Sequence, residues 1–321
     1  MAYYLNDAQR EQVLALQQSF TARTEWPTWL ALIWVYGAWF SLVHFYALLG
    51  PVLGTALLAL NCAFFMSVQH ELVHGHPTRW PGFNKLLGYA PFAVWFPYTL
   101  YVQTHLKHHQ DENLTLPGVD PETNYVSAQT WAGSGAFMRG LYRARLSFWG
   151  RFLFGPAMSI HAIVTDAMGQ LRRGDLRNLG MWFAHGALTV LMLWWVQRVS
   201  GMHPVHYLLG VAYPALSIAM VRSYFEHRAT AHCKQRIATN EASWPMRLLY
   251  LNNNFHLTHH DMPGLAWYLL PKVYWPQREA YLERNGGFRF LGYAPLAWRY
   301  GFRLIDAPTH PGLAEDRSSL P

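Results

Sequence analysis

The feature that most constrains this chain is a set of long stretches without charged side chains. Five segments contain no Asp, Glu, Lys or Arg over about the length that a helix needs to cross a bilayer, roughly 20 residues. They are residues 28–49, 51–69, 86–104, 178–197 and 199–221. Because backbone polar groups in hydrocarbon must be satisfied within the protein, such segments predict helices. We therefore expect an all-α integral membrane protein.

Four of these segments are predicted to pair. The first two are separated by Gly50 alone, and Pro51 suits the first turn of the helix that follows. The last two are separated by Arg198 and meet around Gly201 and Pro204. Short connections of this kind join antiparallel neighbours. Four transmembrane helices in two hairpins are therefore expected.

The middle segment, residues 86–104, differs from the other four. Pro91 and Pro97 interrupt a continuous helix. A full crossing would also place the histidines before and after this segment on opposite sides of the membrane. We expect it to be re-entrant or interfacial and covered by protein. Arginines alternating with apolar residues over 139–173 also suit helices on the membrane surface.

The distribution of basic residues predicts an orientation. Lys and Arg concentrate in residues 71–177 and after residue 221, whereas the two hairpin connections contain almost none. By the positive-inside rule, residues 105–177, residues 222–321 and both termini are expected to face the cytoplasm. The chain is then a single domain, residues 1–321, of the cytoplasmic (inner) membrane with a histidine-rich cytoplasmic cap. Nucleic-acid binding is not expected, since the basic charge is spread rather than striped.

The 17 histidines are not scattered but clustered. The first cluster is His70-Glu-Leu-Val-His74, whose spacing of four puts both rings on one helical face. Two further clusters, at 105, 108 and 109 and at 256, 259 and 260, repeat a spacing of three and four. Imidazole suits iron, copper, zinc and nickel, so the three clusters predict a metal site. The isolated His44, His161 and His185 are expected to be core or interfacial residues.

Two other kinds of metal protein compete with this interpretation. His70-Glu71-Leu-Val-His74 matches the H-E-x-x-H pattern of zinc proteases, so a membrane zinc hydrolase is a rival. A zinc hydrolase uses three protein ligands and a water, which leaves the other two clusters unexplained. A metal transporter would place ionisable residues near the bilayer midplane, whereas these histidines follow helix ends.

The clusters HELVH, HLKHH and HLTHH resemble the three histidine boxes of the membrane fatty acid desaturase and hydroxylase superfamily. Box order, the helix pairs before the first and third boxes, and the long stretch between them also fit. The resemblance implies two irons that activate O2 and oxidise an aliphatic lipid chain. Among the possible reactions, desaturation of a fatty acid or fatty acyl chain is the one we expect. Hydroxylation, ketolation and oxidative decarboxylation to a terminal alkene are alternatives.

The resemblance also implies a set of ligands. A histidine after the fourth helix completes the iron set in this superfamily, and His227 matches it. Where acyl-CoA desaturases have an Asn four residues earlier, this chain has Ser223. His76 and His232 are left as spare histidines with an expected surface position. The implied ligands are His70, His74, His105, His108, His109, His227, His256, His259 and His260.

Further residues near the boxes suit supporting roles. Carboxylates that accept the outer N–H of a ligating ring fix its tautomer, and the acidic residues beside the boxes are Glu71, Asp111, Glu226 and Asp261. Arg222, at the end of the fourth helix, is a candidate anchor for a substrate carboxylate. Electrons are expected from a separate protein such as a ferredoxin with its reductase. A net charge of +7 would favour docking of an acidic carrier.

Overall fold

A computed structural model describes residues 2–110, 113–230, 232 and 235–311. The described chain is mostly helical and divides into two compact units. The span unit comprises residues 24–102 and 155–219. The histidine unit comprises Met1–Arg23, Gln103–Phe154 and Met220–Pro321.

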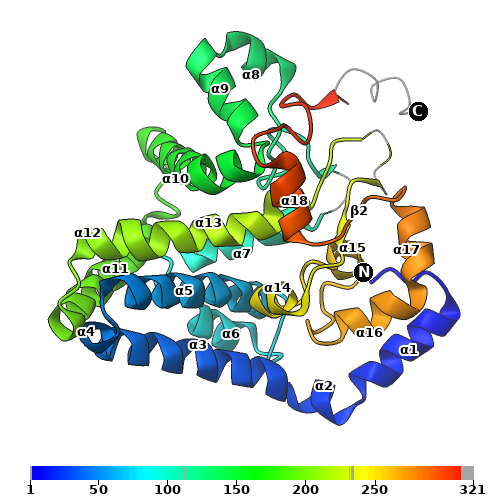
Figure 1. The fold of residues 1–321 in the computed structure, drawn as a ribbon, viewed down its shortest axis with the longest axis horizontal. Coiled ribbons are helices and arrows are strands. Elements are labelled where there is room, and N and C mark those ends of the chain that lie inside the picture. The colour runs from blue at the N-terminus through cyan, green and yellow to red at the C-terminus, as the bar shows by residue number, and fades with distance from the viewer. Residues whose placement is uncertain (1, 111–112, 231, 233–234, 312–321) are drawn as a thin grey trace. The chain divides into compact units, whose positions relative to one another are not determined.

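The span unit contains the long apolar helices (Figure 1). Its elements are α3 (Trp26–His44), α4 (Tyr46–Leu49), α5 (Pro51–Val73), α6 (Pro81–Gly88), α11 (Leu179–Ser200), α12 (Pro204–His206) and the π-helical turn η2 (Tyr207–Ala212). The boundary between the units passes through α2 (Phe20–Thr24), α7 (Tyr98–His108), α10 (Phe148–Arg172) and α13 (Tyr213–Arg222).

The histidine unit consists of short helices and one two-stranded sheet. Its helices are α1 (Asp7–Gln17), α8 (Ala128–Gly133), α9 (Ala136–Ala144), η3 (Ser223–Phe225), α14 (Trp244–Leu249), α15 (His256–Asp261), α16 (Leu270–Tyr274), η5 (Trp275–Gln277), α17 (Arg278–Arg284) and α18 (Tyr293–Tyr300). Strands β1 (Thr239–Asn240) and β2 (Arg289–Phe290) pair in parallel, with Thr239 opposite Arg289. A core that includes Val13, Phe255 and Tyr281 packs α15 among its neighbours.

Among the described residues, four helical stretches are long and apolar enough to cross a membrane, as predicted. They are Trp26–His44, Pro51–Val73, Leu179–Ser200 and Pro204–Phe225.

Several predicted span boundaries are wrong. The third span continues through Arg198 and ends before Gly201, whose φ of 73° is a left-handed helix cap, and the fourth begins at Pro204 rather than at residue 199. One arginine in the last turn does not end a helix, because its charge is favourable there. The first span ends at His44, and the short helix α4 follows it.

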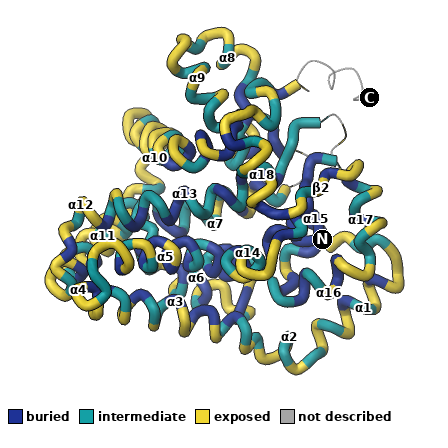
Figure 2. The backbone as a smooth tube through the Cα atoms, viewed as in Figure 1, coloured by how far each residue is buried: buried dark blue, intermediate teal, exposed yellow. Residues whose placement is uncertain are grey.

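The outward faces of these helices are apolar and exposed (Figure 2). On α11 only Met192 and Val196 are buried, while Phe183, Val190 and Leu191 are more than half exposed. A soluble protein rarely leaves an apolar face of this size in water. The exposure is what a helix in contact with lipid requires.

The interruption predicted within residues 86–104 is confirmed. Helix α6 ends at Gly88, residues 89–97 are not helical, and α7 begins at Tyr98. Side chains from α3, α5, η2 and α11 donate to carbonyl oxygens at the end of α6 and in this turn. The pairs are Tyr36 Oη to Leu87 O (2.6 Å), Gln69 Nε2 to Gly88 O (2.8 Å), Tyr207 Oη to Phe92 O (3.0 Å) and His185 Nε2 to Val94 O (2.6 Å). Non-helical backbone is tolerated at membrane depth only when it is satisfied in this way.

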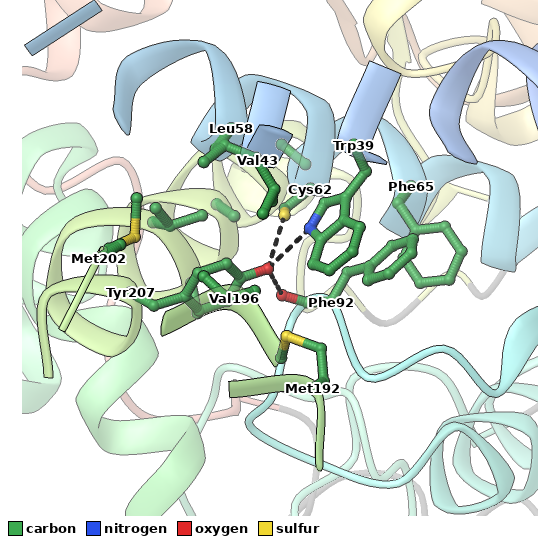
Figure 3. Packing of buried hydrophobic residues seen from close by; sticks show 14 of the residues in the cluster. Trp39, Val43, Leu58, Cys62, Phe65, Phe92, Met192, Val196, Met202 and Tyr207 are labelled. Atoms are coloured by element: carbon green, nitrogen blue, oxygen red, sulfur yellow. Dashed lines mark hydrogen bonds between the residues drawn. The ribbon is translucent and has the colours of Figure 1, made fainter. Parts of the chain in front are cut away.

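Tyr207 is the centre of the buried contacts in the span unit (Figure 3). Its hydroxyl accepts from Trp39 Nε1 at 3.0 Å, lies 3.6 Å from Cys62 Sγ and donates to Phe92 O. The Trp39 ring stacks on Phe92, with ring centroids 4.3 Å apart. One hydroxyl therefore connects three segments that are distant in sequence.

We expect Tyr207→Phe to lower the free energy of unfolding by about 1–3 kcal/mol, because it leaves the buried Phe92 carbonyl and Trp39 N–H without their partner. Thermal unfolding of the purified protein in detergent measures this. Tyr89→Phe is the matched control, since the Tyr89 hydroxyl bonds Thr99 at an exposed site. An equal shift for both variants would contradict the role of Tyr207.

Candidate metal centre

The last turn of α7 aligns three imidazoles. His105 and His108 are buried, and His109 follows directly after the helix. Spacings of three and four residues put all three rings on one side of the turn. The Nε2 atoms of His105 and His109 lie 3.2 Å apart. Local helical geometry alone produces this part of the site.

Helix α15 supplies the third predicted cluster, and all of its residues, His256–Asp261, are buried. It brings His259 to the α7 histidines, because His259 Nε2 lies 3.1 Å from His109 Nε2. His105, His109 and His259 thus form a first set of converging nitrogens within the histidine unit.

A second set joins four histidines from three segments. His227 follows η3 and is held by a bridge to Ile237. Its Nε2 lies 3.0 Å from His108 Nε2 and 2.9 Å from His256 Nε2, and His260 Nε2 lies 3.1 Å from His256 Nε2. The resemblance implied His227 as a ligand, and this residue lies at the middle of the set.

The spacing of these nitrogens fits metal ligation. A metal–nitrogen bond of about 2.1 Å separates ligands at right angles by about 3.0 Å and tetrahedral ligands by about 3.4 Å. The Nε2 pairs in both sets are 2.9–3.2 Å apart. Neutral imidazoles with lone pairs facing one another repel unless a proton or a cation lies between them. Two adjacent sets therefore suit two metal ions.

Carboxylates and an amide hold the outer nitrogens. His105 Nδ1 donates to Glu122 Oε1 and His108 Nδ1 donates to Asp120 Oδ1, each at 2.9 Å. His256 Nδ1 lies 3.3 Å from Asn253 Oδ1. A proton fixed on Nδ1 leaves the Nε2 lone pair free for a metal and raises its basicity.

Burial sets the charge of most of these groups. Burial lowers the pKa of His105, His109, His227, His256 and His260, so these rings are neutral and competent as ligands.

His108 is the exception. Although burial opposes its charged form, Glu122 and Asp120 raise the pKa of His108 to about 9. A metal at Nε2 would take the place of that proton. On the acidic side, burial raises the pKa of Glu226 to about 7.

The first predicted cluster lies in the span unit. His70 and His74 occupy the end of α5, with ring centroids 4.7 Å apart. Glu71 was expected to support a ligating ring, and its Oε1 lies 3.3 Å from His70 Nδ1.

The other predicted supporting residues have different surroundings. Glu226 Oε1 lies 3.6 Å from His256 Nδ1 and 3.9 Å from Arg222 Nε. Asp261 accepts two hydrogen bonds from Arg284, at 2.5 and 2.6 Å. Asp111 lies outside the described residues.

Sequence reasoning missed Asp120, Glu122 and Asn253. The signal for the first two was a Pro- and Gly-containing turn, Leu-Pro-Gly-Val-Asp-Pro-Glu, soon after the second box. Asn253 precedes His256 by three residues, where a short side chain can reach back to the ring.

The two spare histidines differ from each other. The surface position expected for His76 is wrong, because the ring is buried and its Nδ1 donates to Glu25 Oε1 at 2.8 Å. A buried carboxylate partner makes the interior favourable for this ring. His232 is exposed, as expected.

Apolar helices able to span a membrane, together with converging sets of imidazoles that could hold metal ions, are the features of a membrane protein with a candidate metal centre. The chain matches the fatty acid desaturase family over residues 46–292 and belongs to that family. The matched region contains all three boxes and His227, and the family makes the protein a desaturase-like oxidoreductase of lipids. No curated protein matches the chain.

Alanine at any one of six box histidines should lower metal content at least about tenfold, because each change removes one of the converging nitrogens. The six are His105, His108, His109, His256, His259 and His260. Metal analysis of the purified variants measures this.

Alanine at His44 or His185 is the control and should leave metal content near the wild-type value, since neither ring joins a set. Near-normal metal content in two of the six box variants would contradict the assignment of ligands.

Proposed function

We propose that the protein uses two irons and O2 to oxidise an aliphatic lipid chain, and that it desaturates a fatty acid or fatty acyl chain. The observation that carries this proposal is the pair of imidazole sets, whose nitrogens are spaced as metal ligands in a chain of the fatty acid desaturase family. Soluble di-iron sites use Glu ligands on a four-helix bundle, whereas these sets are built from histidine.

We propose nine ligands. His70 and His74 would join His105, His109 and His259 at one iron, while His108, His227, His256 and His260 would hold the other. The spacing of His70 and His74 at the end of an apolar helix and the order of the three boxes support this arrangement. The two units would then act as a single desaturase-like domain over residues 1–321.

The bound irons would supply the oxidising chemistry at an unactivated C–H bond. The residues of this chain would hold and shield them. Asp120 and Glu122 keep the protons of His108 and His105 on Nδ1, away from the metal side of the rings. We propose that Glu71, Asp111, Glu226 and Asp261 add to this outer support. Burial of the rings excludes water, which would compete for the metal.

A zinc hydrolase is the weaker assignment. It needs three protein ligands and one open position. The histidine unit alone brings seven imidazoles into two sets. A single catalytic zinc leaves most of these rings without a role.

The four spans would be arranged as two hairpins in the cytoplasmic membrane, with the histidine boxes and both termini in the cytoplasm. The concentration of basic residues in 71–177 and after 221 supports this orientation. A separate acidic donor, such as a ferredoxin with its reductase, would deliver electrons to this basic side. Reporter fusions after Gly50 and Gly201 that indicate a cytoplasmic location would contradict the orientation.

Arg222 is proposed as an anchor for the carboxylate of an acidic substrate. A small cavity lined by Arg222, Glu226 and His256 lies beside the second set of imidazoles. The Glu226 carboxylate lies 3.9 Å from the Arg222 guanidinium. A carboxylate held there would lie close to His256 and the metal.

Cells that express the protein should accumulate an oxidised lipid chain that is absent from cells expressing His108→Ala. Mass spectrometry of lipids and volatiles identifies it. An internal double bond supports desaturation with the headgroup far from the metal, whereas a terminal alkene indicates a carboxylate beside the metal. Identical lipid profiles in both strains, with equal expression, would contradict the proposal.

In the same assay with purified protein, Arg222→Ala should raise the KM for an acidic substrate about tenfold or more, because a charge-assisted hydrogen bond is lost. Metal content should stay near the wild-type value. An unchanged KM, or loss of metal together with the change in KM, would refute the anchoring role.

A further inference from the structure

The two carboxylates that hold the second box belong to one short loop, residues 113–123, which we call the carboxylate loop. Asp120 is its centre. One Asp120 oxygen takes the N–H of His108 and the backbone N–H of Glu122, both at 2.9 Å. The other oxygen takes the backbone N–H of Thr115 at 2.8 Å. The position of the Asp120 carboxylate therefore depends on where Thr115 lies.

Thr115 has an unfavourable backbone conformation. Its φ of 71° lies in the left-handed region, which a β-branched residue rarely adopts. Such strain persists only where the surroundings over-determine it, and it concentrates at functional sites. Within the loop, Thr123 Oγ1 donates to the Thr115 carbonyl at 2.6 Å. From outside the loop, His310 Nε2 lies 3.0 Å from Thr115 Oγ1, and both residues are buried.

His310 belongs to a segment, residues 305–310, that binds along the end of this loop. We call it the C-terminal strap. Backbone bonds connect its Pro308 and His310 with Val126, at 3.0 and 3.1 Å. The Tyr125 hydroxyl donates to Asp306 at 2.6 Å and accepts from the backbone N–H of Ala229 at 3.1 Å, so the strap is also linked to the segment after His227.

The strap lies beyond the part of the chain that matches the family, which ends at residue 292. The family match therefore does not cover the contacts of the strap.

We propose that His310 is a positioning residue for the metal centre. It holds the strained Thr115, Thr115 directs Asp120 through its backbone N–H, and Asp120 fixes the proton and orientation of His108. This inference rests on the proposed function insofar as His108 ligates a metal. It adds that a segment outside the family match controls how firmly that metal is held.

The test compares His310→Ala with His310→Gln, whose terminal amide can occupy the place of Nε2 and bond Thr115. The quantity measured is the rate at which the purified full-length protein releases its bound metal to a chelator. His310→Ala should release metal about tenfold faster than wild type. This is the low end of the loss in metal affinity that follows when a residue hydrogen-bonded to a ligating histidine is removed. His310→Gln should be close to wild type.

Tyr274→Phe is the matched control. It removes another buried hydrogen bond of the histidine unit, from Tyr274 Oη to Glu241 Oε1 at 2.7 Å, and it leaves the carboxylate loop intact. This variant should lower the unfolding temperature without changing metal release. If it released metal as fast as His310→Ala, or if His310→Ala matched wild type, the positioning role would be overturned.

Hydrogen exchange separates this inference from the proposed function. Without His310, the amide protons of Thr115 and Glu122 should exchange faster, whatever metal is bound, because the Asp120 contacts loosen. Unchanged exchange at both amides would overturn the inference even in an iron enzyme. Faster exchange in a protein that contains no iron would support the positioning role of His310 and refute the di-iron function.

Discussion

The structure depends on one electrostatic requirement, which is that the lone pairs of several neutral imidazoles face one another across about 3 Å. Seven histidines of the histidine unit converge in sets of three and four. Burial lowers the pKa of five of them, whereas Glu122 and Asp120 raise the pKa of His108. Without a cation the arrangement is unfavourable, because each buried Nε2 would need a proton that its neighbour also needs. Metal ions bound between α7, α15 and the segment after η3 would compensate these nitrogens.

The Nδ1 atoms, on the other side of the rings, require negatively charged or polar acceptors rather than a cation. Asp120, Glu122 and Asn253 lie within hydrogen-bond distance of the Nδ1 atoms of His108, His105 and His256 and can accept their protons. The Asp120 carboxylate is itself held by backbone N–H groups of a strained loop, and the C-terminal strap holds that loop. Bound metal ions would add a positive layer inside these rings and the carboxylates outside them. In the span unit, side chains similarly satisfy the non-helical turn at residues 89–97.

The features that could be predicted from the sequence are local. The spans follow from charge-free length, and the placement of His105, His108 and His109 on one side of the last turn of α7 follows from the helical repeat. The break after Gly88 follows from Pro91 and Pro97. The span boundary at Gly201 was misplaced because Arg198 was given more weight than the glycine that ends the helix.

The remaining features arise from tertiary contacts. Asp120 lies 12 residues from His108, and nothing in its local pattern distinguishes it from a surface turn. Asp261, directly beside His260, instead pairs with Arg284, 23 residues away. His76 is buried because Glu25, far earlier in the chain, accepts its proton. Adjacency to the third box therefore did not predict the partner of Asp261.

The central claim is that these imidazole sets hold two irons. Metal analysis of the purified full-length protein, combined with Mössbauer spectroscopy after growth on iron-57, tests it most directly. The account predicts about two irons per chain, with the spectrum of a histidine-rich non-haem site. About one zinc per chain, with little iron, would contradict it and favour the hydrolase.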